Sequence, residues 1–172
     1  MQPKHPRESR TEQVQILMFD TMNGYSRLFG GKLMEWIDVV AAVVARRHSG
    51  CNVTTAAVDS LVFLRPAHVN DTIILEGTIT YAGRTSMEVR VRTYCEALSG
   101  ARERINEAYL VLVAIDDNER PIPVPPVLPE TDEEKAAYEV LNGTLCHVAE
   151  KSLVSVSACT LRNLEDNRRF QL

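Results

Sequence analysis

NGYSRLFGGKLMEWIDVVAAVVARRH, residues 23–48, is the stretch that decides the fold. Its apolar residues recur at three- and four-residue spacing, which places them on one face of a helix. They are Leu33, Trp36, Ile37, Val40, Ala41 and Val44. The opposite face is also largely apolar, and the carboxylate of Asp38 lies within the same helix. We therefore expect a core helix that is buried on nearly all sides.

The segments that flank this helix carry strand patterns. A short apolar run at 14–19 precedes it, and after Gly50 the period of the apolar residues changes from about 3.6 to 2. Four long strands are expected, at 51–64, 72–82, 85–98 and 104–115. Turn residues separate them, so we expect an antiparallel meander of four strands.

One such sheet cannot cover a helix that is apolar all round. A second copy of the chain would complete the burial if the two sheets met edge to edge and formed one continuous sheet. The sequence therefore predicts a homodimer as the minimal unit.

The two ends of the chain differ in composition from this core. Residues 1–12 are polar and are expected to form a flexible arm, followed by a single domain over 13–129 and a helix with a tail over 130–172. Thr131 and Glu134 have the spacing of a capping box, which predicts that the C-terminal helix starts there.

Composition restricts the classes of function. The 172 residues carry a net charge of -4, which gives no electrostatic case for binding nucleic acid or an anionic membrane. No run of about 18 apolar residues and no apolar leader occurs, so we expect no membrane insertion and a cytoplasmic location. The four cysteines are far apart and form no CxxC pair, so neither a zinc site nor a disulfide framework is indicated.

Several linked motifs together resemble a known family. They are N-x2-S-x2-FGG-x-L-M-x-W-x-D from position 23, ARRH at 45–48, VTTAAVDSLVFLRP at 53–66 and GRTSMEV at 83–89. They resemble the hotdog-fold acyl-CoA thioesterases of the bacterial YciA-like and eukaryotic cytosolic acyl-CoA hydrolase type. The resemblance implies an α+β hotdog fold, in which a long antiparallel β-sheet wraps around a central α-helix and dimerises into a continuous sheet, with a C-terminal helical tail.

The same resemblance implies an activity and an assembly. The activity is hydrolysis of acyl-CoA to free fatty acid and coenzyme A, with no metal and no redox cofactor. Dimers, tetramers and hexamers built as trimers of dimers are all compatible with it. The family usually carries glycine at the position of Ser26, so the preferred acyl chain stays open.

Four residues are candidates for catalysis. Asp38 is a general base or a nucleophile for thioester hydrolysis. Gly30 and Gly31 stand at the helix start, where unpaired N–H groups would polarise a thioester carbonyl. The resemblance places Asn23 opposite Asp38 of a second chain. Each also has a purely structural explanation, as a solvent-facing acid, a tight turn into a helix or a turn residue.

Six further residues are candidates for binding the substrate or coenzyme A. Arginine and hydroxyl groups suit phosphate, and the resemblance places coenzyme A near the turn at 83–86. The candidates are Phe29, Asp59, Arg65, Arg84, Thr85 and Ser86. Asp59 is expected to anchor the site rather than to touch the ligand, and the turn residues are equally explained by an ordinary surface position.

Two other functions remain open. A hotdog dehydratase generally uses a histidine near the helix mouth, and none occurs between residues 6 and 47. A non-catalytic acyl-CoA sensor of this fold tends to carry a DNA-binding domain, which the N-terminal arm is too short to hold. No G-x-S-x-G elbow, phosphate-binding loop or dinucleotide motif offers a different catalytic set.

Overall fold

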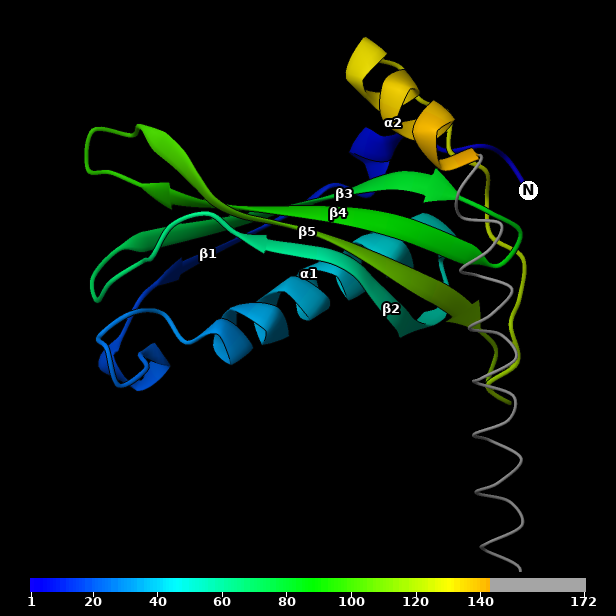
Figure 1. The fold of residues 1–172 in the computed structure, drawn as a ribbon. Helices are drawn as coiled ribbons and strands as arrows, with labels where there is room; N and C mark the ends of the chain where they lie inside the picture. The colour runs from blue at the N-terminus through cyan, green and yellow to red at the C-terminus, as the bar shows by residue number, and fades with distance from the viewer. Residues whose placement is uncertain (143–172) are drawn as a thin grey trace, which may run out of the picture.

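The computed structural model describes residues 1–142 and contains one antiparallel sheet curved around a long helix (Figure 1). Its strands are β1 (Thr11–Ile16), β2 (Asn52–Phe63), β3 (Thr72–Ala82), β4 (Ser86–Glu96) and β5 (Arg102–Ile115). The helices are α1 (Gly30–Ser49) and α2 (Asp132–Asn142), with short 3-10 turns η1 (Pro6–Glu8) and η2 (Phe19–Thr21). The concave face of the sheet holds α1 and the convex face holds α2. The expected α+β hotdog architecture is confirmed.

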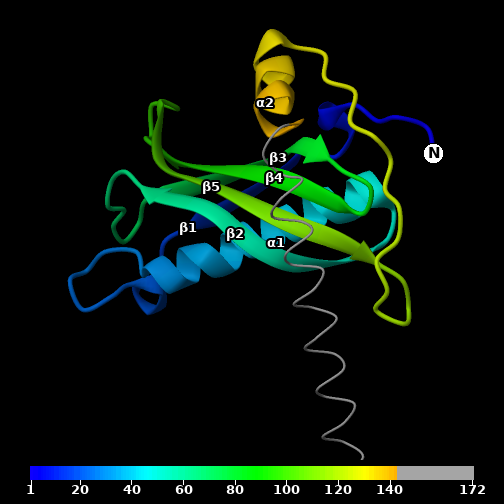
Figure 2. The same ribbon diagram turned by 45° about the vertical axis from the view of Figure 1, so that its right-hand side comes forward.

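The order of the strands is β1-β3-β4-β5-β2, and all neighbouring pairs are antiparallel. The segment β3 to β5 is a meander as predicted, but β2 pairs with β5 and not with β3, so the four-strand meander is wrong at that point. The chain leaves β2 at one edge and returns through residues 64–71 to the other side of the sheet (Figure 2). Alternation along a strand shows which face is buried, not which strand lies beside it, so this order is not readable from the pattern.

One apolar face holds α1 against the sheet. The six residues predicted for that face are all buried, among them Trp36 at 8% exposure. The backbones approach closely at Gly77, where an added Cβ would lie 2.7 Å from the side chain of Val40 and 2.8 Å from that of Val44. The helix ends as expected, because Gly50 adopts a φ of 72° and donates its N–H to the carbonyl of Arg46.

The opposite face of α1 is uncovered in the single chain, which differs from the expected burial on nearly all sides. Asp38 is exposed, Val39 is 51% exposed, and Ala42 and Val43 are half-buried. Beside this face runs β2, which is an edge strand of the sheet. An apolar helix face next to an unpaired strand fits the contact expected in a homodimer.

The loop before α1 is shaped by two residues. The Oδ1 atom of Asn23 accepts the N–H groups of Tyr25 at 2.9 Å and of Arg27 at 3.2 Å. Ser26 has a φ of 56°, in the left-handed region that favours glycine. The glycine that the family usually carries at this position is therefore explained by the backbone conformation.

Residues 1–12 are attached more firmly than the expected flexible arm. The N–H of Lys4 donates to the carbonyl of Pro126 at 2.9 Å, and its Nζ donates to the carbonyl of His48 at 2.7 Å. The first strand already begins at Thr11. The chain is therefore already packed before the expected boundary between residues 12 and 13.

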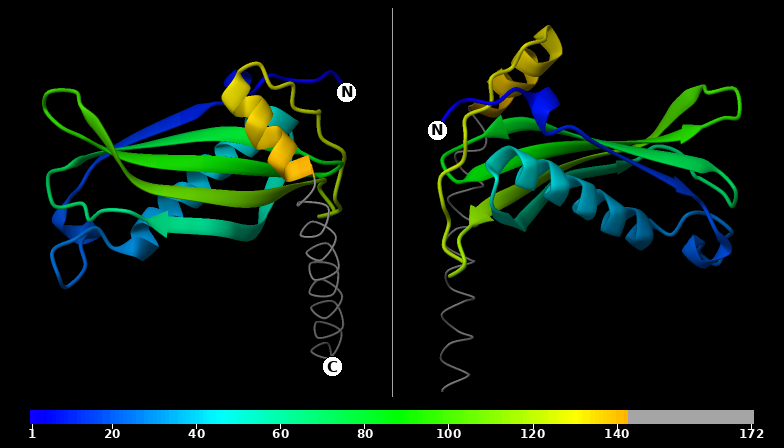
Figure 3. Two further views of the ribbon diagram at one scale, coloured as in Figure 1. Left: turned by 45° about the horizontal axis from the view of Figure 1, so that its top comes forward. Right: turned by 180° about the vertical axis from the view of Figure 1, so that it is seen from behind.

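The helix α2 lies across the convex face near β3 (Figure 3). Its predicted capping box is confirmed, since the N–H of Glu134 donates to Thr131 Oγ1 at 3.2 Å and the N–H of Thr131 donates to Glu134 Oε2 at 3.0 Å. The ring of Tyr138 lies 5.2 Å, between centroids, from that of Tyr81 in β3. The tail predicted beyond residue 142 lies outside the described residues.

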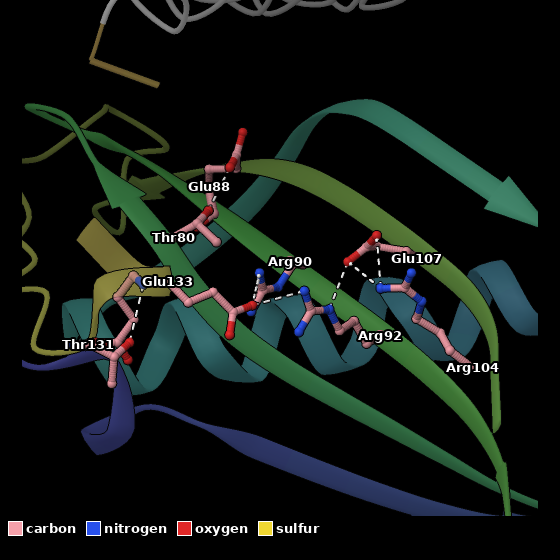
Figure 4. Close-up of polar contacts among 9 residues, drawn as sticks. Thr80, Glu88, Arg90, Arg92, Arg104, Glu107, Thr131 and Glu133 are labelled. Carbon is pink, nitrogen blue, oxygen red and sulfur yellow. Dashed lines mark hydrogen bonds and ion pairs between the residues drawn. The ribbon is translucent and has the colours of Figure 1, made fainter. Parts of the chain in front are cut away.

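Charged side chains tie α2 to the sheet (Figure 4). Glu133 Oε1 accepts hydrogen bonds from Arg90 at 3.1 Å and from Arg92 at 3.0 Å. On the same face Glu88 is only 1% exposed, and Thr80 Oγ1 donates to its carboxyl at 2.6 Å. Burial raises the pKa of the Glu88 carboxyl above its usual value, although the Thr80 hydrogen bond opposes that shift.

Candidate active site

The first turn of α1 leaves backbone donors free at one end of the concave face. Phe29 precedes the helix in an extended conformation, and its side chain provides no cap. The carbonyl of Phe29 accepts the N–H groups of Lys32 at 2.9 Å and of Leu33 at 3.1 Å. The N–H groups of Gly30 and Gly31 have no partner among the described residues, so the positive end of the helix is available to an electron-rich ligand atom.

Two phenyl rings flank these glycines. A Cβ added to Gly31 would lie 2.6 Å from Cε1 of Phe29, and one added to Gly30 would lie 3.4 Å from Cζ of Phe63. Any side chain at residue 31 would therefore displace the Phe29 ring. The rings of Phe29 and Phe63 therefore limit the space through which a ligand atom can approach the N–H groups of Gly30 and Gly31.

The carboxylate of Asp38 lies further along the helix. It is eight residues beyond Gly30, which corresponds to about 12 Å along the helix axis. Thr55 Oγ1, on β2, donates a 2.6 Å hydrogen bond to Asp38 Oδ1. This bond fixes the orientation of the carboxylate while the side chain stays at the surface of the single chain. Thr55 is a candidate site residue that could not be found from the sequence, because a threonine in a strand carries no signal of its own.

Asn23 lies in the loop before the helix and lines a pocket at the helix mouth. Its Oδ1 is held by the turn, whereas no hydrogen bond is found for its amide nitrogen within the described chain. Within the described residues of one chain no hydrogen bond connects Asn23 with Asp38, and Asp38 does not line the pocket that Asn23 lines. Their expected meeting across a subunit interface therefore stays a prediction.

The residues expected to bind coenzyme A are divided between the two ends of the sheet. Arg65 lines the same pocket as Asn23 and forms a 2.7 Å ion pair with Glu103. The turn that carries Arg84, Thr85 and Ser86 joins β3 to β4 at the opposite end. Within one chain the structure does not bring the two groups together.

That turn contains only one side chain that is open to solvent and unbonded. Arg84 is exposed and has no side-chain partner among residues 1–142, whereas Thr85 is buried. Asp59 is the extra residue of a bulge in β2, and its charge contributes to the raised pKa of Glu88. Asp59 thus faces the convex side of the sheet, away from the helix mouth.

Neither a group of metal ligands nor a membrane-spanning helix is found in the part of the chain that is described. No group of three or more His, Cys, Asp and Glu side chains there is arranged to hold a metal ion. Cys51 and Cys95 are free thiols, and Cys146 and Cys159 lie beyond the described residues. None of the helices within residues 1–142 combines the length and the apolar character that a membrane span requires.

Comparison with known proteins places the chain in a family. The model of the "Thioesterase superfamily" matches residues 25–99. The chain is 44% identical over 120 residues to the uncharacterized acyl-CoA thioester hydrolase YkhA of Bacillus subtilis, and the match covers 69% of each protein. It is 31% identical to the cytosolic acyl coenzyme A thioester hydrolase of Rattus norvegicus, of which it spans only 35%.

Solved structures agree with this placement. An apo-hexameric acyl-CoA thioesterase superposes with a TM-score of 0.79 at 38% identity, over 91% of this chain and 98% of that one. The acyl-CoA hydrolase of Staphylococcus aureus, in complex with butyryl coenzyme A, coenzyme A and coenzyme A disulfide, gives 0.78 at 33% identity, over 94% and 98%.

Three further structures of the staphylococcal enzyme carry alanine in place of an asparagine, an aspartate and a threonine. The positions of those three residues differ by 15 and then 17 residues, as do the positions of Asn23, Asp38 and Thr55 here. Together with the family model and the 44% identity, this agreement completes the assignment. The chain belongs to the thioesterase superfamily, among the hotdog-fold acyl-CoA thioester hydrolases.

Proposed function

We propose that this protein hydrolyses acyl-CoA thioesters to free fatty acid and coenzyme A. The observation that carries the proposal is the 2.6 Å hydrogen bond from Thr55 to Asp38, which holds a carboxylate in one orientation on the open face of α1. The matching intervals in the staphylococcal hydrolase, which binds butyryl coenzyme A, support the same use of these residues here.

Each candidate residue takes a distinct part in the reaction. Asp38 removes the proton of the attacking water, or attacks the thioester carbonyl itself, with its Oδ2 free because Oδ1 accepts the bond from Thr55. The N–H of Gly31, with that of Gly30, stabilises the oxyanion, and one such donor contributes about 3 kcal/mol. The amide nitrogen of Asn23 orients the water or the thioester.

A second copy of the chain completes the site. The edge strand β2 has no partner on its outer side within the described chain, and it exposes Val58 next to the open face of α1 that carries Val39. Pairing of two β2 edges would bury these side chains and extend the sheet across both copies. A homodimer is therefore the minimal unit, in which Asn23 of one copy faces Asp38 of the other. The hexameric relative favours a trimer of such dimers.

Coenzyme A binds at the rim of this assembled site. Arg65 is exposed at the pocket beside Asn23, with Phe29 at the helix mouth. Because the 83–86 turn lies at the far end of the sheet, Arg84 reaches the phosphates only from a different copy, while Thr85 and Ser86 shape the turn. No metal or redox cofactor takes part in this mechanism. A cytoplasmic location is supported by the name of the rat relative.

A steady-state assay of thiol release tests the hydrolysis. Asp38→Ala is expected to lose turnover on every acyl-CoA while its fold and oligomeric state persist. Glu35→Ala is the matched control, because Glu35 is an exposed acid on the same helix that pairs with Lys32. Binding of acyl-CoA by the unmodified protein with no release of thiol would instead favour the non-catalytic sensor. Hydration of an enoyl-CoA without thiol release would favour the dehydratase.

A mixing experiment tests the shared site. Asn23→Ala and Asp38→Ala chains, each inactive alone, are unfolded together in equal amounts and refolded. If Asn23 and Asp38 act across the interface, half of the dimers are mixed and each mixed dimer holds one intact site, which restores about a quarter of the unmodified activity. If both residues act within one chain, the mixture stays inactive.

A further inference from the structure

A pocket of about 310 Å³ opens beside the first turn of α1. Its floor consists of Leu33, Ala67 and Ile105, none of which is more than 3% exposed. These residues come from α1, from the connection after β2 and from β5, so the pocket ends where the helix meets the sheet. The floor of this recess is apolar and closed, whereas the rest of its lining includes polar side chains.

The recess begins at the helix mouth. Phe63 forms part of its wall, and Cζ of Phe63 lies 3.4 Å from the position of a Cβ on Gly30. The polar residues Asn23, Arg27 and Arg65 stand at its rim. A thioester carbonyl bound to the free N–H groups of α1 would send its acyl chain past Phe63 toward the floor. The charged rim would keep the coenzyme A portion outside.

We infer that this recess holds the acyl chain and restricts efficient hydrolysis to chains of about ten carbons or fewer, an inference that rests on the acyl-CoA hydrolysis proposed above. A methylene group occupies about as much room as a water molecule in the liquid, roughly 30 Å³. The recess therefore has room for about ten such groups. A palmitoyl chain is too long for it.

Two buried polar side chains next to Ile105 in the sheet oppose the passage of longer chains. Asn106 follows Ile105 in β5 and pairs across the sheet with Thr93 of β4. Both side chains are fully buried, and among the described residues neither Asn106 Oδ1 nor Thr93 Oγ1 has a hydrogen-bond partner. The Asn106 amide donates to the carbonyl of Val62 at 2.8 Å, which holds it beside Phe63, its partner in the register of β2 and β5. An alkyl chain that passed Ile105 would meet these oxygens instead of apolar surface.

A panel of acyl-CoA substrates from acetyl to palmitoyl tests this limit, with thiol release as the readout. For the unmodified protein, kcat/KM should rise about fourfold for each added methylene group that is buried, reach its maximum at eight to ten carbons, and fall at least tenfold by palmitoyl. Ile105→Ala deepens the recess and should raise the ratio of tetradecanoyl to octanoyl kcat/KM at least tenfold.

The control for that substitution is Ile79→Ala. Ile79 is as deeply buried under α1 as Ile105 but does not line the recess, so its truncation should lower stability without moving the chain-length optimum. Ala67→Val fills the floor and should shift the optimum at least two carbons shorter. If Ile105→Ala fails to fold, the shift of the optimum in Ala67→Val alone tests whether the recess sets the preferred chain length.

Two results would overturn the assignment of the recess while leaving hydrolysis intact. One is a kcat/KM that keeps rising to palmitoyl, and the other is a profile that Ile105→Ala and Ala67→Val leave unchanged or that Ile79→Ala shifts equally. Absence of thiol release from every acyl-CoA would overturn the proposed hydrolysis itself, and the assignment of the recess with it.

Discussion

Replacing Thr55 with valine removes one hydrogen bond and changes the volume of the side chain very little. The lost bond runs from Oγ1 to the carboxylate of Asp38 at 2.6 Å. A hydrogen bond to a charged group contributes about 1.5–3 kcal/mol, and the lower end applies here because both side chains are at the surface of the single chain. If the bond positions the carboxylate for the reaction, kcat falls about tenfold. KM changes little, because Thr55 does not line the pocket at the helix mouth.

Thiol release measured over a range of substrate concentrations separates these two constants. Thr55→Ser restores the hydroxyl and should recover most of kcat. Thr54→Val is the matched control, since Thr54 is the preceding residue of β2 and its side chain points to the other face of the sheet. The reasoning is refuted if Thr55→Val keeps kcat within twofold of the unmodified protein, or if Thr54→Val loses as much.

Three further predictions concern other parts of the fold. Ser26→Gly relieves a left-handed backbone at φ 56° and should raise the free energy of unfolding by about 0.5–1 kcal/mol in urea titrations; a decrease would show that the hydroxyl matters more than the backbone. Glu88→Gln removes a carboxyl whose pKa is raised by burial, so the folded state binds its proton more tightly than the unfolded state does. The unmodified protein therefore gains stability from this group as the pH falls from 7 toward 4.5, and the advantage of Glu88→Gln at pH 7 should shrink over the same range; a constant difference between urea titrations across that range would contradict this. Gly31→Ala places a methyl group 2.6 Å from the Phe29 ring and beside the free N–H groups, so kcat for thiol release should fall at least tenfold although alanine favours the helix; full activity would remove the helix mouth from the mechanism.

The sequence was sufficient to predict those structural elements that a local residue pattern defines. The buried face of α1 follows from residues at three- and four-residue spacing, and Gly50 ends that helix as a left-handed cap. The capping box of Thr131 and Glu134 is equally local. Linked motifs also identified the family before any coordinates, and the comparisons confirm that identification.

Contacts between segments that are far apart in the chain could not be predicted from the sequence. The position of β2 beside β5 depends on the path of residues 64–71 across the end of the sheet, and no periodicity encodes that path. Thr55 meets Asp38 only because β2 lies under the open side of α1. The firm attachment of Lys4 likewise depends on residues more than forty positions away in the chain. Each of these contacts joins segments whose own patterns are ordinary.

The single tryptophan of the chain, Trp36, lies on the buried face of α1 only two residues from Asp38. An indole in apolar surroundings emits at shorter wavelength than one in water, so its fluorescence reports whether α1 is seated on the sheet. The emission therefore comes from one known place in the molecule, with no signal from other indoles to subtract. Unfolding of each variant can be followed at this helix without a label, and a change in emission on addition of acyl-CoA would register an event at α1, the helix that carries the candidate carboxylate.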